Sequence, residues 1–87
     1  MSDEIDEIQE TVADITRQAR GDRTLKEFAE VVGSDVTSVW RWENNVRVPK
    51  LGFLWERSVN GEGETREWAL KCLAALGQDV SRITTTI

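Results

Sequence analysis

The segment that most constrains this chain is the run from Thr24 to Pro49, which predicts two short helices joined by a tight turn. In its first half, apolar residues recur at helical spacing at Leu25, Phe28, Ala29 and Val32. Gly33 then predicts the end of the first helix, since glycine adopts positive φ without a steric cost. Asp35 can cap a second helix by accepting from its free N–H groups. Val39 and Trp42 are three residues apart, so they share the face that packs back onto the first helix.

The order and spacing of these residues resembles the helix-turn-helix of the lambda-repressor-like family, also called the Cro/C1 or XRE family. The resemblance spans 26 of the 87 residues, and its shared positions are Phe28-Ala29-Glu30, Gly33, Val39, Arg41-Trp42-Glu43-Asn44, Asn45, Arg47 and Pro49. A helix-turn-helix places its second helix in a DNA groove. The resemblance therefore implies an all-α fold, sequence-specific binding of double-stranded DNA, and transcriptional regulation by a repressor-like homodimer.

The resemblance also assigns roles to individual side chains. The positions that face bases in the family are occupied here by Val36, Thr37, Trp40 and Arg41. Arg41 suits a bidentate contact to guanine, whereas Val36 and the methyl group of Thr37 suit thymine methyl groups. Contacts to the DNA backbone are expected from Thr24, Lys26, Ser38, Asn44, Arg47 and Lys50. For Trp40 two alternatives stay open: a ring packed flat on the neighbouring protein surface, or a ring lying against deoxyribose, a thymine methyl group or the edge of the groove.

Three positions depart from the family pattern. Leu25 stands where members usually carry a glutamine that touches the DNA backbone. Asp35 replaces the usual capping serine or threonine, and so brings a negative charge close to the expected phosphates. Asn45 replaces the usual glycine after the second helix, a mild change because asparagine tolerates the left-handed conformation that ends a helix.

The net charge of −5 is unevenly distributed along the chain. Residues 1–14 carry six acidic and no basic side chains, a net charge of −6. Residues 15–50 carry seven basic and five acidic side chains, a net charge of +2, and residues 51–87 carry four and five, a net charge of −1. The positive balance falls on the helix-turn-helix and its flanks, which is the distribution that a phosphate-binding face needs.

Residues 2–20 are predicted to form an extended, acidic first helix that is capped by Ser2. Its apolar residues step by three and four positions, at Ile5, Ile8, Val12, Ile15 and Ala19. This stripe either packs on the core or projects, with its acidic first half meeting a partner chain. Towards the end of this helix, Arg17 or Arg20 is expected to hold Glu43, the residue that the resemblance marks as structural.

The chain is expected to form one domain, residues 1–87, in which residues 24–44 are the helix-turn-helix core. Five helices are predicted, over residues 2–20, 24–32, 36–44, 50–57 and 64–76. The last helix is apolar over most of its circumference, so it must be covered on more than one side. We expect one side to meet the core and the other a second subunit, through Trp68, Leu73 and Leu76. The rival interface is the first helix, through Ile5, Ile8 and Val12, although its carboxylates would repel across a parallel pair.

Other function classes find little support in the sequence. The chain has no histidine and a single cysteine, so we expect no zinc site, no cofactor and no activated nucleophile, and therefore no enzyme. No apolar run approaches about 18 residues and no signal core is visible, so a cytoplasmic protein is expected. The competing function is a protein-interaction module: an antitoxin or adaptor whose acidic first helix or apolar last helix binds a toxin or a regulator.

Overall fold

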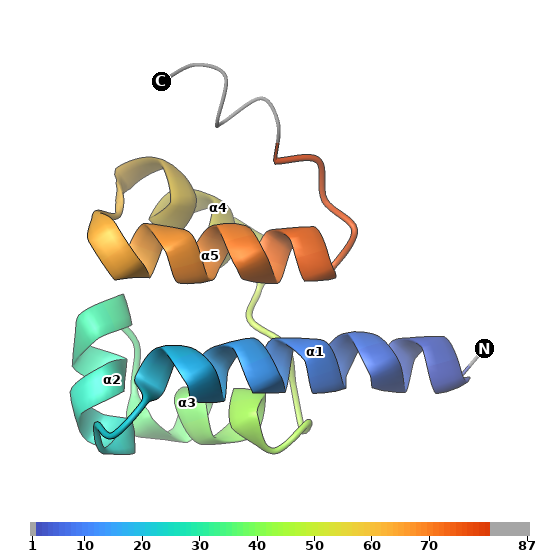
Figure 1. The fold of residues 1–87 in the computed structure, drawn as a ribbon, viewed down its shortest axis with the longest axis horizontal. Coiled ribbons are helices and arrows are strands. Elements are labelled where there is room, and N and C mark those ends of the chain that lie inside the picture. The colour runs from blue at the N-terminus through green and yellow to red at the C-terminus, as the bar shows by residue number, and fades with distance from the viewer. Residues whose placement is uncertain (1, 81–87) are drawn as a thin grey trace.

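The computed structural model describes the backbone of residues 2–80 and the side chains of residues 11–80. These residues form an all-α structure (Figure 1) with the helices α1 (Ser2–Arg20), α2 (Leu25–Val32), α3 (Val36–Glu43), α4 (Leu51–Asn60) and α5 (Gly63–Ala75). The five predicted helices are confirmed. The largest difference is at α4, which runs three residues further than expected because Gly61 N–H still donates to the Arg57 carbonyl at 2.9 Å.

Local caps set the ends of the two short helices. Thr24 and Glu27 form a capping box at the start of α2, in which each side chain accepts from the backbone N–H of the other residue. Gly33 ends α2 in the left-handed conformation with φ 74°, as predicted. Asn45 follows α3 with φ 59°, so this asparagine does take the conformation for which the family uses glycine. The predicted cap by Ser2 lies outside the described side chains.

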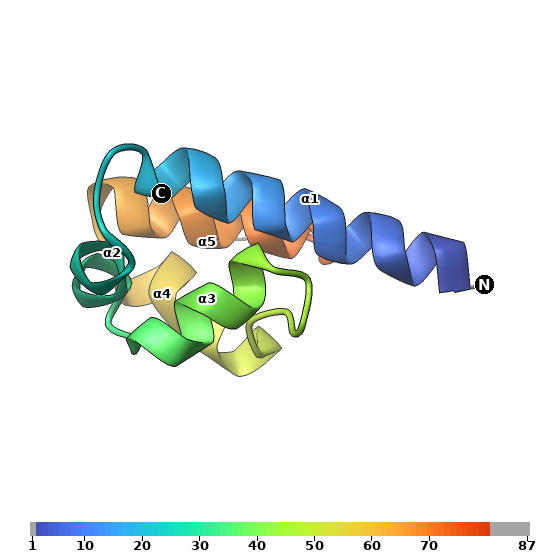
Figure 2. The same cartoon turned by 90° about the horizontal axis from the view of Figure 1, so that it is seen from below.

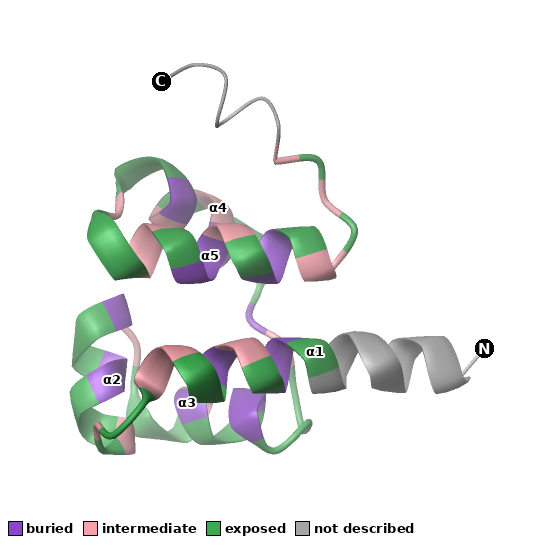
Figure 3. Cartoon of the chain, in the orientation of Figure 1, coloured by how far each residue is buried: buried purple, intermediate pink, exposed green. Residues whose placement is uncertain are grey.

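The helices pack in a small bundle. α1 and α5 run antiparallel beside each other, α4 packs on another side of α5, and α3 contacts both α1 and α2 (Figures 1 and 2). The backbone of the first turns of α1 projects beyond the other helices in both views. Buried residues lie on the inner faces of the helices (Figure 3), and the core is formed by Val12, Phe28, Ala29, Val32, Val39, Trp42, Leu54, Trp68, Ala69, Cys72 and Leu73.

Trp68 of α5 lies at the centre of this core and contacts each of the other four helices. Its ring is 5.9 Å from that of Phe28 on α2 and 5.4 Å from that of Trp42 on α3, measured between centroids. The ring of Phe53 on α4 is 6.3 Å away. The indole N–H donates to the hydroxyl of Thr16 on α1 at 3.1 Å, which satisfies the polar group of a buried tryptophan.

The prediction that Trp68 and Leu73 contact a second subunit is wrong. Their side chains are 1% and 0% exposed inside the core of their own chain. The apolar circumference of α5 is covered by α1 on one side and α4 on the other. Leu76, the third predicted contact, is only partly buried, so its side chain remains available for contact with a second subunit. Helical periodicity indicates which faces are covered but not which element covers them, and that is why the prediction failed.

The apolar stripe of α1 packs on the core as far as the structure describes it. Val12 is fully buried, and Ile15 and Ala19 are partly buried against the same cluster. The side chains of Ile5 and Ile8 lie outside the described residues, so the alternative of a partner-binding first half remains a prediction for them.

Cys72 is buried, and burial raises the pKa of its thiol from the ordinary 9.0 to about 12, against a smaller opposing effect of the Thr16 hydroxyl. We expect this thiol to resist Ellman's reagent at pH 8 in the folded chain and to react when guanidinium unfolds it. Since the unfolded chain loses this proton near pH 9 and the folded chain holds it to about pH 12, the contribution of this thiol to stability falls between these values, by about 1.4 kcal/mol per pH unit. Rapid reaction of Cys72 with Ellman's reagent in the folded chain would contradict this burial of the thiol.

Candidate nucleic-acid interface

Helix α3 begins at a side-chain cap. Asp35 Oδ1 accepts from the backbone N–H of Ser38 at 2.8 Å, and Ser38 Oγ donates to Asp35 Oδ2 at 3.0 Å. These hydrogen bonds hold the pKa of the Asp35 carboxyl below its ordinary value of 3.8, and the charge of Arg41 adds to the effect. The predicted cap is therefore confirmed, and its carboxylate is ionised at neutral pH.

All four predicted base-contacting residues of α3 are exposed. Val36 is 42% exposed and Trp40 is 48% exposed, and Thr37 and Arg41 also lie at the surface. On the opposite side Val39 is fully buried. The helix thus has one anchored face and one open face, and the open face combines apolar, hydroxyl and cationic groups.

A hollow of about 340 Å³ lies beside α3, between its first turns and the segment that leads into α4. It is lined by Ser34, Ser38, Arg41, Trp42, Arg47, Val48, Lys50 and Phe53. Three of these side chains are cationic, and among the described residues none of the three forms an ion pair. Ser34 and Ser38 add two hydroxyl groups to the lining. The hollow can therefore receive an anion of phosphate size.

The structure brings together only part of the predicted backbone-contacting set. Ser38, Arg47 and Lys50 lie around the hollow, with Ser34 as a further hydroxyl that the sequence did not single out. Ser34 directly follows Gly33, the residue that ends α2. This position in the turn between α2 and α3 is the sequence feature that could have indicated it. The remaining three, Thr24, Lys26 and Asn44, are exposed outside the hollow. Asn44 already donates from Nδ2 to the Trp40 carbonyl at 2.8 Å.

Arg57 of α4 fastens the turn between α2 and α3, a role that the sequence did not reveal. Its Nε donates to the Val32 carbonyl at 2.7 Å and its Nη2 to the Gly33 carbonyl at 3.0 Å. A guanidinium is favourable here because the end of a helix carries partial negative charge. The φ of 74° at Gly33 strains any residue with a side chain, and a Cβ there would lie 2.7 Å from Arg57 Nη2 and displace this guanidinium. The same guanidinium stacks 4.2 Å from the centroid of Phe53, which lines the hollow.

Glu43 ties the other end of α3 to α1. Its carboxylate, 5% exposed, accepts from Arg20 Nε at 2.7 Å and from Arg20 Nη2 at 2.9 Å, while Arg17 donates to its backbone carbonyl. This hydrogen-bonded carboxylate raises the pKa of Arg20. The predicted pairing of Glu43 with the first helix is confirmed, and both candidate arginines take part through different atoms.

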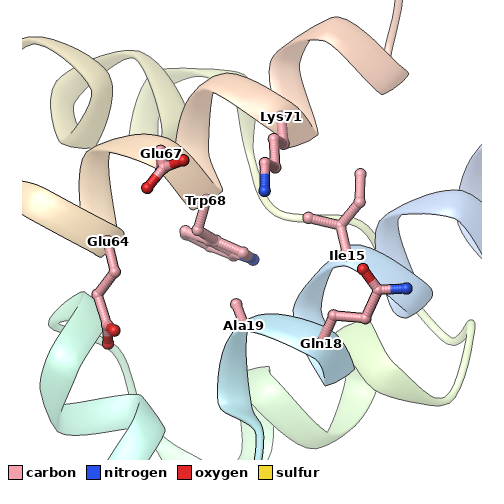
Figure 4. A pocket seen from close by; sticks show the side chains of 7 residues that line it. All are labelled: Ile15, Gln18, Ala19, Glu64, Glu67, Trp68 and Lys71. Carbon is pink, nitrogen blue, oxygen red and sulfur yellow. The ribbon is translucent and has the colours of Figure 1, made fainter.

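A second hollow, of about 400 Å³, lies between α1 and α5 (Figure 4). It is lined by Ile15, Gln18, Ala19, Glu64, Glu67, Trp68 and Lys71. Its charges are of mixed sign, and Glu64 already pairs with Arg23. Trp68 has almost no exposed surface to offer a ligand. This hollow therefore lacks the convergent charge that distinguishes the one beside α3.

No family model, curated protein or solved structure matches this chain. Within the described residues, no helix is long and apolar enough to cross a membrane. In that same part of the chain, no group of three or more histidine, cysteine, aspartate or glutamate side chains is placed to hold a metal ion.

Proposed function

We propose that this chain is a lambda-repressor-like DNA-binding protein that recognises a specific double-stranded sequence and represses transcription as a homodimer. In this proposal α2 and α3 form the helix-turn-helix, and α3 enters the major groove. The observation that carries it is the adjacency of two surfaces: the open side of α3 and the hollow lined by Arg41, Arg47 and Lys50. The first surface supplies contacts to base edges, and the second supplies phosphate contacts beside it.

The anchoring of α3 supports this role. A readout helix has to be held rigidly while its outer face stays free, since small displacements disrupt base contacts. Here Glu43 holds one end of the helix to α1, and Asp35 and the Arg57-braced turn hold the other. The carboxylate of Asp35 opposes phosphate binding, and the hydrogen bonds from Ser38 and the nearby Arg41 partly offset its charge.

The test is a fluorescence-anisotropy titration of the purified chain against random genomic duplex at 50 and 200 mM salt. If a dimer makes about six phosphate contacts, affinity should fall roughly 10³-fold between these two concentrations. Lys50→Ala should reduce the slope of log K against log salt by about one per subunit. Lys71 is exposed on α5, away from the hollow beside α3, so the control variant Lys71→Ala should leave this slope unchanged. A folded chain that binds no duplex at 50 mM salt would refute the proposal.

Arg41→Ala is expected to flatten the base preference at one base pair in each half-site while leaving the fold intact. Arg41 is exposed on α3, and a bidentate contact from arginine to guanine contributes about 1–3 kcal/mol of discrimination. Binding-site selection with wild type and variant measures the difference. Identical selected motifs would show that Arg41 does not read a base.

The dimer contact is expected at the end of α5, around Leu76, now that Trp68 and Leu73 are excluded. Two-fold pairing allows two readout helices to meet successive major grooves about 34–36 Å apart. Leu76→Glu should therefore give a monomer in sedimentation equilibrium, and Ile8→Glu a dimer. The reverse result would place the interface on α1, and a monomeric wild type at micromolar concentration would exclude both.

One observation favours a second candidate function, an antitoxin or adaptor that binds a partner protein. The first turns of α1 project from the bundle (Figure 2), and residues 1–14 carry six acidic and no basic side chains. Such a helix suits a partner with a basic surface. A chain that stays folded but binds no duplex at 50 mM salt would favour this function over the first.

A further inference from the structure

We propose that Val36 and Trp40 form an apolar pair that selects 5-methylpyrimidines, so that the preferred DNA carries thymine methyl groups against this pair. The inference rests on the proposed DNA binding and adds the chemical group that α3 recognises. It also decides between the two alternatives for Trp40, in favour of a ring that contacts a thymine methyl group.

The two side chains are one helical turn apart and share the open side of α3. They are 42% and 48% exposed, so two neighbouring apolar side chains face the solvent on one side of this eight-residue helix. The ring of Trp40 differs from those of Trp42 and Trp68, which contact each other and Phe53 in tilted and edge-to-face arrangements. Within the described residues Trp40 has no ring partner, and its indole N–H has no hydrogen-bond acceptor.

The charges around this pair favour DNA over an apolar protein surface as its occupant. Arg41 follows Trp40 directly, and Arg47 and Lys50 stand with it around the adjoining hollow. An apolar partner surface would have to desolvate these cations without compensation. DNA supplies phosphates for the cations, and within the major groove the apolar group at a base edge is the C5-methyl of thymine.

The consequence is a sensitivity to a single methyl group. Uracil pairs like thymine and presents the same O4 acceptor, so thymine-to-uracil replacement removes only the methyl contact. Burying one such carbon contributes about a fourfold gain in affinity. Two methyl groups, one for each side chain, should together give about fifteenfold. The 5-methyl group of methylated cytosine occupies the same place and should restore part of the affinity of a cytosine substitution.

The experiment begins with binding-site selection by the full chain, followed by anisotropy titrations on the selected duplex. Each selected thymine is replaced in turn by uracil, by cytosine and by 5-methylcytosine. The chains compared are wild type, Val36→Ala and Trp40→Ala, with Val59→Ala, an exposed valine on α4, as the matched control. Thermal melting checks that each variant is folded.

We expect uracil to weaken wild type and Val59→Ala about fourfold at one or two positions, and 5-methylcytosine to bind about fourfold better than cytosine there. Trp40→Ala should lose the sensitivity at one position and Val36→Ala at the other. If selection enriches no sequence, the proposed function itself fails. If a motif is enriched but uracil duplexes bind as tightly as thymine duplexes, DNA binding stands and methyl readout is overturned. Equal uracil sensitivity in wild type and Trp40→Ala removes Trp40 from the readout.

Discussion

Replacing Trp68 with alanine is expected to lower the free energy of unfolding by about 3–5 kcal/mol, the range for a fully buried tryptophan. The effect is large because this one side chain contacts the four other helices, through Phe28, Trp42, Phe53 and Thr16. The substitution also leaves the Thr16 hydroxyl without its indole donor. A domain of this size has about 5–15 kcal/mol of stability in total, so much of it would be lost.

Urea unfolding followed by circular dichroism measures this difference, and the melting temperature should fall by at least about 12 °C. Trp40→Ala is the matched control, since it removes the same side chain from an exposed site and should change stability by less than about 0.5 kcal/mol. Equal losses from the two substitutions would show that Trp68 does not organise the core.

Replacing Glu43 with glutamine is expected to lower the free energy of unfolding by about 2–3 kcal/mol. Both carboxylate oxygens accept from the Arg20 guanidinium in a bidentate pair, and an amide turns one acceptor into a donor facing that cation. Glu43 is 5% exposed, so water cannot replace the lost hydrogen bond. The partial exposure of Arg20 keeps the expected loss below that of a fully buried pair.

The melting temperature checks this, with Glu30→Gln as the control, since Glu30 is exposed on α2 and should change stability by less than about 0.5 kcal/mol. Because the pair also fixes the end of α3, weaker sequence-specific binding is expected wherever the variant is still folded. A melting temperature unchanged by Glu43→Gln would show that Glu43 behaves as an ordinary surface charge and that its pairing with Arg20 does not hold the end of α3.

The sequence by itself determined the helices and the sides of α2 and α3 that turn inward. These features depend on contacts within three or four residues: Gly33 and Asn45 allow left-handed backbone, Asp35 caps α3, and the spacing of Val39 and Trp42 selects the buried face. The same local logic put Trp40 and Arg41 on the open face. The pairing of Glu43 with α1 was expected from the resemblance to the lambda-repressor-like family, which left the choice between Arg17 and Arg20 open.

Only the tertiary structure decided which elements meet. The apolar surface of α5 showed that it is covered, but not that α1 and α4 of the same chain cover it, so Trp68 and Leu73 were wrongly given to a second subunit. The brace from Arg57 to the turn at Gly33 was likewise invisible, since 24 residues separate the two. Hydrophobic burial has no direction and the reach of a long cationic side chain is set by packing, so neither can be obtained from local spacing.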